Sequence, residues 1–571
     1  MTESHKHDGD AVVSPRTVGE YLEASFRETS LRRNTHHYIS DMLDHYTPEA
    51  VFEGIYGLEE HLKNIVLFFH AHNTSLERRL LLFVGPQGAG KSYTVDKIKK
   101  HLDLYSHTPQ GALWAVKGCP FHQHPFDLIP HVERDELKNE HDIRWFPEAI
   151  ACPVCEQKVK RHGNWRDVPV ERIHVSTTGK CGLAKHTPTD LRREDITNFL
   201  GNVNFSKLKK IGSTYDPESF DFEGKIIWAN RGILDWTEIF KSRRQLLGLL
   251  LELIQSKRID MANFPTVHVD EIVLGHTNFP EYQVFVNEEI MEPLRGRIFK
   301  IEFPYGLDIE NEKRILHKCI ERTDHLKHQV RHVAEDTLTF AATYAVRTRK
   351  DSKGMNGLSP RFFQDVISIA YTQATECIDL ETLSLAILKM FEHKSHKDLN
   401  VEKLKETFEK TKEDFLHERI DTFINHLIPN SKQFSEYGQK YYRNYLDAVV
   451  RNVKGEKLSP TEEGLINEVE DLLVAKEKIS PKGKAAFESV LMERFDELTG
   501  MSYDRNEQLG AVINEVVFNH VKSFLRLSNK TKRIDEQSRE VQRILRDTLI
   551  RDHGYCKHCA QVLFKVLGDH I

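Results

Sequence analysis

A glycine-rich octapeptide, GPQGAGKS at residues 85–92, has the clearest chemical meaning in this chain. It fits the P-loop pattern G-x-x-x-x-G-K-[ST] and follows the apolar run LLLFV, so a buried strand leads into a phosphate-binding turn. The glycines let backbone N–H groups point inward, and a helix that begins near Lys91 directs its positive end at the anion. Lys91 supplies a cation for the β- and γ-phosphates, and Ser92 offers a hydroxyl to Mg²⁺. We therefore expect a nucleoside triphosphate and Mg²⁺ at these residues: Gly85, Pro86, Gln87, Gly88, Ala89, Gly90, Lys91, Ser92 and Tyr93.

Such a site also needs carboxylates at the end of a second strand, one to orient the Mg²⁺ shell and one to position a nucleophile. The candidate segment is WANRGILDWTEIF at residues 228–240. Here Glu238 takes the catalytic position, and Thr237 stands where an aspartate is usual. Asp235 lies two residues earlier, and we expect it to help hold the metal through water. The alternative for Glu238 is a surface position on a helix.

The segment HVDEIVLGHTN places acidic residues before an apolar run and polar residues after it. A Walker B pair follows its strand, so Asp270 and Glu271 do not fit that role. Asn278 follows the strand and would lie between the γ-phosphate and the Glu238 carboxylate, where it could orient water. This is the sensor-1 role of an AAA+ ATPase, and the gap of about 40 residues from Glu238 fits it.

Two further arginines match positions that AAA+ proteins use. In EPLRGRI, Arg297 is the first choice and Arg295 the second for an arginine finger that completes the site of a neighbouring subunit. In GLSPRFF, Arg361 opens a helix and resembles the sensor-2 arginine of the AAA+ lid. Surface charge is the alternative for each.

Four residues of the metal-ligand type form two pairs about thirty residues apart. Cys119 and His122 form a C-x₂-H pair, and Cys152 and Cys155 form a C-x₂-C pair. Two such knuckles complete a tetrahedral site for Zn²⁺, which would stabilise a segment too polar to build its own core. Reduced cysteines without metal, or a redox function, are the alternatives. Two other residues compete as the fourth ligand: Cys181 and His186.

Cys556 and Cys559 form one more C-x₂-C pair near the end of the chain. No second pair lies close to them in sequence, and the surrounding pattern is helical. We therefore expect these two cysteines to be structural.

The elements around these motifs predict an α/β domain. Apolar residues at helical spacing mark residues 17–46 and 59–69 as helical. Strand-like runs lie at 112–116, 172–175, 225–228, 272–276 and 298–303. Strands and helices that alternate after a P-loop imply three layers around a mainly parallel sheet. Residues 308–391 and the charged remainder of the chain follow helical patterns.

Composition excludes several classes of protein. The 571 residues suggest two to four domains, and 39% hydrophobic residues suffice for ordinary cores. A net charge of −6 argues against a dedicated nucleic-acid binder. No apolar run spans a bilayer and no signal peptide is evident, so we expect a cytoplasmic protein without membrane contact, whose eight cysteines are not paired in disulfides.

Taken together, the motifs resemble those of the PrkA family, bacterial AAA+ proteins called serine protein kinases. From residue 52 onward the carrying pieces are FEGIYGLEEHL, GPQGAGKS, GCPFHQHPFDLIPH, ACPVC, VHVDEIVLGHTNFPEY, EPLRGRIFKIEFPY, LSPRFFQD and HGYCKHCAQVLFKVLG. The resemblance implies ATP as the nucleotide, a stress- or starvation-linked role, and a joint function for Cys119, His122, Cys152 and Cys155.

The resemblance also implies a domain plan. We expect a disordered tail at 1–16, an AAA+ core at 17–303 with a Cys/His-rich insertion at about 118–222, a helical lid at 304–392, and a helical C-terminal PrkA domain at 393–571. AAA+ subunits commonly form rings, so we expect a homo-oligomer that acts on protein substrates or clients.

The expected reaction is ATP-dependent serine/threonine protein phosphorylation, with Glu238 as the base toward a serine hydroxyl. The sequence lacks the H-R-D-x-x-x-x-N loop of eukaryotic-type kinases, and its DFEG is not D-F-G. The alternative is an AAA+ ATPase that remodels or degrades client proteins, and a third reading is an ATP-gated scaffold. A protease would need a nucleophile and a base, and the nearest Ser–Lys combinations, common by chance, are Ser480 and Ser489 beside Lys482 and Lys484.

Overall fold

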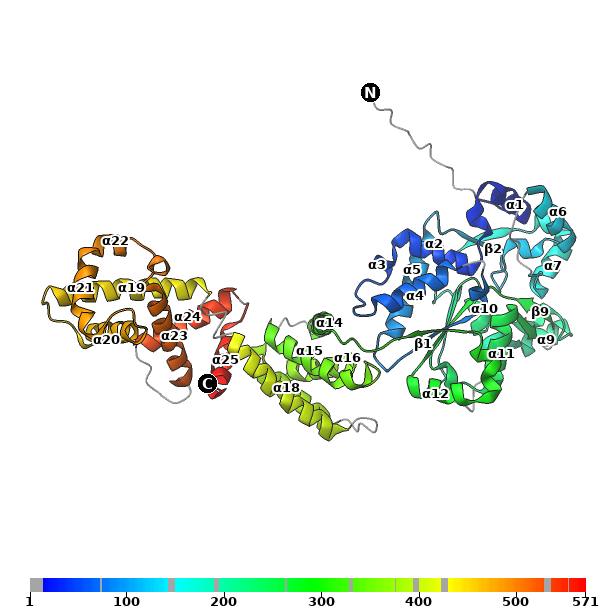
Figure 1. The fold of residues 1–571 in the computed structure, drawn as a ribbon. Helices are drawn as coiled ribbons and strands as arrows, with labels where there is room; N and C mark the ends of the chain where they lie inside the picture. The colour runs from blue at the N-terminus through cyan, green and yellow to red at the C-terminus, as the bar shows by residue number, and fades with distance from the viewer. Residues whose placement is uncertain are drawn as a thin grey trace, which may run out of the picture. The chain divides into compact units, whose positions relative to one another are not determined.

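The computed structural model describes residues 14–71, 74–141, 149–188, 195–261, 264–327, 332–374, 376–393, 400–422, 430–527, 536–552 and 554–570. The chain divides into two compact units (Figure 1). The first unit comprises Met1–Leu307 with Asp351–Ser359, and the second comprises Asp308–Lys350 with Pro360–Ile571.

A parallel five-stranded sheet forms the centre of the first unit, in the order β11-β1-β10-β7-β4. Its strands, in chain order, are β1 (Leu80–Val84), β4 (Leu183–His186), β7 (Ile233–Trp236), β10 (Ile272–Thr277) and β11 (Ile298–Glu302). The strand before the P-loop, β1, thus lies between β11 and β10, the last two strands of this sheet in chain order. This is the strand order of an AAA+ core, so the predicted fold class is confirmed.

Strand β1 supplies side chains to two separate cores. Leu80, Leu82 and Val84 belong to the core that includes helix α11 (Arg244–Ser256). Leu81 and Phe83 belong to the opposite core. That core also contains residues of the helices on the other face of the sheet (Figure 1): α2 (Thr35–Tyr46), α4 (Glu59–His70) and α5 (Lys91–His107). Because side chains alternate along a strand, this pattern produces the predicted three layers.

Three predicted strands are placed differently in the structure. Residues 225–228 lie in a short helix, α10 (Lys225–Ala229), because a short apolar run does not distinguish a buried helix from a strand. Strands β2 (Leu113–Val116) and β3 (Val170–Ile173) pair with each other in an antiparallel ribbon outside the main sheet. Conversely, β4 of the main sheet lies inside the segment expected to be an insertion, 118–222.

The beginning of the chain contacts this ribbon. Residues 1–13 of the predicted disordered tail lie outside the described residues. Arg16 accepts a hydrogen bond at its carbonyl oxygen from the N–H of Val170 at 2.9 Å, and Pro15 is buried. The described part of the tail is therefore packed, and helix α1 (Val18–Arg27) follows it directly.

The second unit is mostly helical. Its main helices are α14 (Ile309–Lys327), α15 (Glu335–Arg349), α16 (Pro360–Gln373), α17 (Leu380–His393), α18 (Val401–Thr422), α19 (Lys432–Val453), α20 (Pro460–Ala475), α21 (Lys484–Glu493), α23 (Gly510–Leu527), α24 (Glu536–Asp552) and α25 (Lys557–His570). Phe408 of α18 packs edge-on against Phe340 and Tyr344 of α15. The predicted lid and C-terminal residues therefore share part of their packing.

A fully buried ion pair joins two helices of this unit. Arg349 donates to both carboxylate oxygens of Glu312, each at 2.7 Å, and neither side chain is exposed. Burying one of these charges alone would cost several kcal/mol, so the pair holds α14 and α15 in one register.

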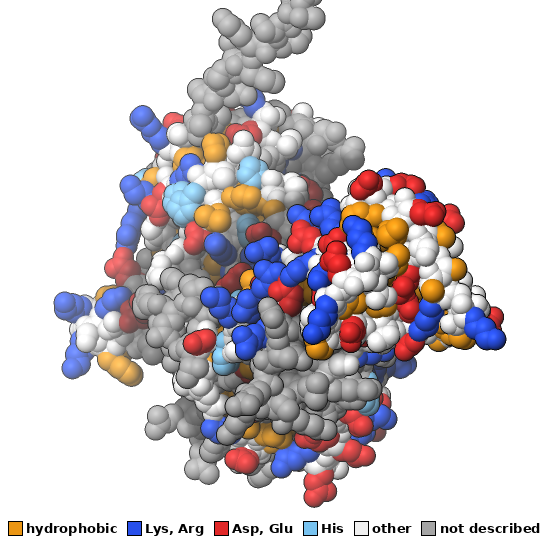
Figure 2. All heavy atoms as spheres, turned by 90° about the vertical axis from the view of Figure 1, so that its left-hand side faces the viewer, with side chains coloured by type: hydrophobic (Ala, Val, Ile, Leu, Met, Phe, Trp, Pro, Cys, Tyr) orange, Lys and Arg blue, Asp and Glu red, His pale blue; other side chains and the backbone are white. Residues whose placement is uncertain are grey.

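The described surface carries charges of both signs. Figure 2 shows Lys and Arg side chains interspersed with Asp and Glu on the face it draws. Within the described residues, no helix has the length and apolar character needed to cross a membrane.

Asp270 connects three segments before β10 begins. Its carboxylate accepts hydrogen bonds from Lys257 at 2.7 Å and from the Thr35 N–H at 2.6 Å. Burial by itself would raise the pKa of the Asp270 carboxyl, but Lys257 and the Thr35 N–H outweigh it and lower this pKa to about 2. The role of Asp270 is thus to hold the amino-terminal side of the sheet, away from the P-loop.

We predict that Asp270→Asn lowers the free energy of unfolding of the first unit by about 2–3 kcal/mol at neutral pH. Because the pKa is lower in the folded chain than the value of about 3.9 in the unfolded chain, the stabilisation is present above pH about 4 and is lost as the pH falls toward about 2. Urea unfolding followed by tryptophan fluorescence reports on this unit, since all five tryptophans lie in it. The exposed control Glu49→Gln should leave both stability and its pH dependence unchanged.

Candidate functional site

The P-loop follows β1 and is shaped by three glycines. Gly88 and Gly90 have φ values of 80° and 93°, a region that L side chains rarely adopt. At Gly85 a Cβ atom would lie 2.2 Å from the carbonyl oxygen of Phe303, so only glycine fits there. The Tyr305 hydroxyl donates to the carbonyl oxygen of Gln87 at 2.6 Å and anchors the loop from the segment after β11.

The two polar P-loop side chains lie at the start of α5. The Lys91 ammonium donates to the carbonyl oxygens of Gly85 at 2.5 Å and Pro86 at 2.8 Å, so it lies against the loop. The Ser92 hydroxyl lies 3.5 Å from Nδ1 of His276 on β10. With the positive end of a 17-residue helix, these donors fit a triphosphate and its Mg²⁺.

Strand register brings the other predicted residues to the same edge of the sheet. Gly275 of β10 is level with both Leu82 of β1 and Trp236 of β7. The residues after β7 and β10, Glu238 and Asn278, therefore leave the sheet on the P-loop side. The Thr277 carbonyl oxygen also accepts the N–H of Gly85 at 3.3 Å, which connects the end of β10 to the loop.

A chain of polar contacts joins Glu238 to Asn278. Lys241 lies 2.8 Å from the Glu238 carboxylate and 3.2 Å from that of Glu281. Glu281 in turn accepts a hydrogen bond from the Asn278 amide at 2.9 Å, while Asn278 caps helix α12 (Phe279–Asn287). The pKa of Lys241 is raised, chiefly by the hydrogen bond that Lys241 donates to Glu238. Sequence reasoning missed Lys241 and Glu281, because ordinary charged residues near a helix start carry no motif.

Glu238 has an unusual backbone conformation. Its φ of 52° and ψ of 44° place a non-glycine residue in the left-handed region, directly after the strand. Such conformations cost about 1–3 kcal/mol and often occur at functional sites. The turn directs the side chain at Lys241 rather than along the strand.

Asp235 lies deeper than the prediction implied. Its side chain is 2% exposed on β7, and its carboxylate lies 2.7 Å from Lys99 of α5 and 3.2 Å from Nε2 of His276. Burial lowers the pKa of His276 to about 4, so the imidazole is neutral at pH 7. A neutral ring with its proton on Nε2, the nitrogen nearer Asp235, leaves Nδ1 to accept a hydrogen bond from the Ser92 hydroxyl. This geometry favours a positioning role for Asp235 over direct contact with a metal.

The hydroxyl of Thr237, at the usual aspartate position, is a buried donor. Its Oγ1 has no hydrogen-bond partner among the residues that the structure describes. A buried hydroxyl without a partner between Asp235 and Glu238 fits a place where the water shell of Mg²⁺ would be held.

The two predicted arginines occupy different surroundings. Arg297 precedes β11, and its guanidinium donates to the Pro293 carbonyl oxygen at 2.7 Å. The Arg295 guanidinium is bonded to the Val286 carbonyl oxygen. Arg361 belongs to the second unit, where it is exposed in the first turn of α16, and its sensor-2 role stays a prediction.

The structure brings three of the four predicted zinc ligands together. The sulfur atoms of Cys119, Cys152 and Cys155 lie within 4.8 Å of one another, and all three side chains are buried. His122 lies outside this group. Its buried Nδ1 has no hydrogen-bond partner within the described part of the chain, and a φ of 46° turns its backbone. The donor set fits zinc if His122 rotates toward the three sulfurs.

The competing ligands belong elsewhere. Cys181 packs in the core on the other face of the sheet from Cys119. The His186 ring packs against Phe199 and Trp236, with centroids 4.5 and 5.2 Å away. Neither residue joins the cysteine group.

Comparison with known families decides the assignment. Residues 27–356 match the family model of the PrkA AAA domain, and residues 323–565 match that of the PrkA serine protein kinase C-terminal domain. The chain belongs to the PrkA family. The resemblance inferred from the motifs is thereby confirmed, and with the AAA+ core it shows that this chain is an enzyme that uses ATP.

Curated relatives of this PrkA-family chain carry two different descriptions. It is 27% identical to the ATP-dependent protease PrkA of Bacillus subtilis, over 99% of this chain and 98% of the relative. It is 23% identical to the serine/threonine kinase YeaG of Escherichia coli K12, over 75% of this chain and 72% of the relative. Among solved structures, NtrX from Brucella abortus in complex with ADP matches with a TM-score of 0.33 and 11% identity, covering 64% of this chain and 67% of NtrX.

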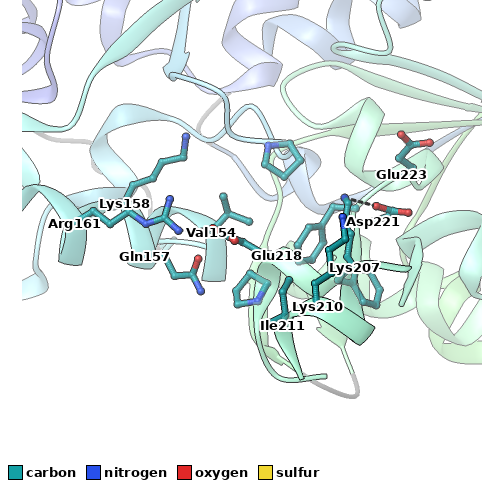
Figure 3. Close-up of a pocket in the computed structure, with 14 residues that line it drawn as sticks. Val154, Gln157, Lys158, Arg161, Lys207, Lys210, Ile211, Glu218, Asp221 and Glu223 are labelled. Atoms are coloured by element: carbon teal, nitrogen blue, oxygen red, sulfur yellow. Dashed lines mark hydrogen bonds and ion pairs between the residues drawn. The ribbon is translucent and has the colours of Figure 1, made fainter. Parts of the chain in front are cut away.

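A cavity of about 660 Å³ lies beside the cysteine knuckles of this PrkA-family chain. Figure 3 shows Lys158 and Arg161 of α7 (Pro153–His162) on one side, and Lys207 and Lys210 of α9 (Phe205–Ile211) on the other. Carboxylates are interspersed with these cations, and Lys207 lies 2.7 Å from Asp221. Both knuckles contribute to its wall, through Pro120 and Val154, so a metal at the three cysteines would stabilise this cavity.

We predict that Gly85→Ala weakens ATP binding at least about tenfold, because the added methyl displaces the P-loop from Phe303. Titration with a fluorescent ATP analogue measures the loss. Gly248→Ala is the matched control, since its Cβ meets no atom within 4 Å and alanine favours the interior of α11. Unchanged affinity in Gly85→Ala would contradict the close contact with Phe303.

Proposed function

We propose that this PrkA-family chain hydrolyses ATP within a ring of identical subunits and uses the cycle to act on protein substrates. One observation carries the proposal. Glu238 and Asn278 leave the sheet on the P-loop side, and Lys241 and Glu281 connect them. Arg297 lies at the other ends of the strands, just before the start of β11.

The residues at the P-loop edge divide the work of hydrolysis. MgATP supplies the γ-phosphoryl group, and residues 85–93 would hold it, with Lys91 on the phosphates and Ser92 toward Mg²⁺. Glu238 takes a proton from the attacking water, and Asn278 orients that water. Lys241 orients the Glu238 carboxylate through their ion pair at 2.8 Å.

The position of Arg297 in the sheet supports a role at the site of a neighbouring subunit. It immediately precedes Ile298, which is level with Leu80 at the start of β1, whereas the P-loop begins after Val84. Five residues of strand separate these levels by about 16 Å. Arg297 therefore serves the site of a neighbouring subunit, and Arg361 of the lid is the sensor-2 candidate within the chain.

Protein serine/threonine phosphorylation is the second candidate reaction. It is supported by the name of the YeaG relatives and by the chemistry of Glu238, which can accept a proton from a serine hydroxyl as well as from water. Proteolysis is supported by the name of the Bacillus subtilis relative, which aligns over nearly the whole chain.

Among the Ser and Lys residues named from the sequence, the contacts of Lys484 and Ser489 do not favour proteolysis. Lys484 forms an ion pair with Asp471 at 2.8 Å, and this contact chiefly raises the pKa of the lysine. A lysine held in its charged form is a poor general base. The Ser489 hydroxyl donates to the Ala485 carbonyl oxygen of its own helix.

The proposed setting follows from the family and the composition. We place the protein in the cytoplasm, in a stress- or starvation-linked role, with a structural zinc ion at Cys119, Cys152 and Cys155. The cavity beside these cysteines is the candidate contact for a polar segment of a client.

Incubation with γ-labelled ATP and casein separates the reactions. Label on casein serine supports the kinase, free phosphate with new peptides supports a protease, and free phosphate alone supports remodelling. We expect Lys91→Ala to abolish nucleotide binding and Glu238→Gln to retain ATP while turnover falls at least about 100-fold. Wild-type turnover in Glu238→Gln would contradict the assignment of the base.

The role of Arg297 is tested by mixing variants. We expect Arg297→Ala to lower turnover by about 10³-fold without weakening ATP binding. Mixing it with Lys91→Ala should restore turnover that neither variant has alone, because a mixed ring contains interfaces with an intact P-loop and an intact arginine. Arg295→Ala is the matched control and should retain turnover. If Arg295→Ala loses turnover and Arg297→Ala does not, Arg295 is the arginine finger.

A further inference from the structure

A second cluster of metal-ligand side chains lies in the second unit. It consists of His332, Cys377, Cys556 and Cys559, whose ligand atoms all lie within 4.8 Å of one another. In the sequence, Cys556 and Cys559 form an isolated pair. Folding supplies the missing partners from more than 170 residues away.

Backbone pairing places two of these residues side by side. Strand β12 (His332–Val333) pairs in parallel with β13 (Cys377–Ile378), and His332 is directly opposite Cys377. Opposite residues of a strand pair point to the same face. The imidazole of His332 and the thiol of Cys377 therefore lie side by side, next to Cys559 near the C-terminus.

The C-x₂-C segment supplies the other two ligands. The Cys559 sulfur lies 3.0 Å from that of Cys377 and 3.3 Å from Nδ1 of His332. The Cys559 N–H donates to the Cys556 sulfur at 3.3 Å, so the segment folds back on itself as a knuckle at the start of α25. Gly554, with a φ of 69°, makes the turn that leads into it.

The outer nitrogen of the histidine is already engaged. Nε2 of His332 lies 2.9 Å from the Gly554 carbonyl oxygen, to which it donates. This bond sets the tautomer and leaves the lone pair of Nδ1 directed at the cysteines. Histidines that bind metals are commonly oriented by a hydrogen bond of this kind.

The distances suit a tetrahedral zinc ion. Zn–S bonds of about 2.3 Å and Zn–N bonds of about 2.0–2.1 Å give ligand separations of about 3.6–3.8 Å. The spacings of 3.0 Å between Cys559 and Cys377 and 3.3 Å between Cys559 and His332 would each lengthen by less than an ångström to reach this geometry. Cys377 and Cys559 are each 2% exposed, so water would not compete strongly for the site.

We propose that His332, Cys377, Cys556 and Cys559 bind a structural zinc ion that clamps the C-terminal helix α25 to the β12–β13 pair. Two neighbouring contacts also join the C-terminal segment to the residues that follow β12 and β13. The Tyr555 hydroxyl is hydrogen-bonded to Asp336, and His558 lies 3.3 Å from Asp379. The ion connects the predicted lid to the last helix of the chain, and this proposal is independent of the reaction that the enzyme catalyses.

Elemental analysis of the full chain, purified under reducing conditions without chelator, tests the site. The Cys152→Ser/Cys155→Ser background removes the first cysteine cluster. In this background we expect about one zinc ion per chain. Adding Cys559→Ser should lower zinc at least tenfold, whereas Cys319→Ser, a free half-buried cysteine of the same unit, should leave it unchanged.

A second variant distinguishes metal binding from a loss of folding. His332→Cys preserves a four-ligand site, so it should retain zinc, and its Co²⁺ derivative should show the absorption spectrum of four sulfurs rather than three sulfurs and a nitrogen. An unchanged Co²⁺ spectrum would overturn the assignment of His332. Absence of zinc from the background protein after dialysis against zinc, stoichiometric iron in its place, or a disulfide between Cys377 and Cys559 would overturn the proposal.

Discussion

Complete burial of strand β1 is the constraint on which the first unit depends. All five of its residues are 0% exposed, because β10 and β11 cover its edges and two helical layers cover its faces. Each buried Leu, Val or Phe side chain contributes about 1.5–3 kcal/mol, so the strand has one position in the sheet. The P-loop therefore leaves from a rigid support, close enough to Phe303 that residue 85 has to be glycine.

Charges buried near this strand connect the sheet to the loop. The Asp235 carboxylate inside β7 would be costly by itself, but Lys99 from α5 lies 2.7 Å away and offsets that cost. Because α5 begins with the P-loop lysine, the same ion pair holds the phosphate-binding helix against β7. His276 lies between Asp235 and Ser92, so the polar side chains form a continuous path from the core of the sheet to the loop.

Cysteines provide connections where the segments are short or polar. The group of Cys119, Cys152 and Cys155 joins two knuckles to the wall of the cavity in Figure 3. The group around Cys559 joins a two-residue strand pair to the end of the chain. The first group packs within a large apolar core, whereas the second belongs to a small cluster with Ala334, where a shared ion would provide the stability that a larger core provides elsewhere.

The sequence alone determined the P-loop, the AAA+ class and the family, because these depend on local patterns: glycines that permit positive φ, a lysine and serine at fixed spacing, and apolar runs that must be buried. It also predicted Glu238 and Asn278 as site residues, since each follows an apolar run. Only the tertiary structure decided that residues 225–229 are helical, that β4 completes the sheet, and that Lys241 and Glu281 join the two predicted residues. It likewise brought His332 and Cys377 to Cys556 and Cys559. These outcomes depend on contacts between residues far apart in the chain, whose energies no local window of sequence contains.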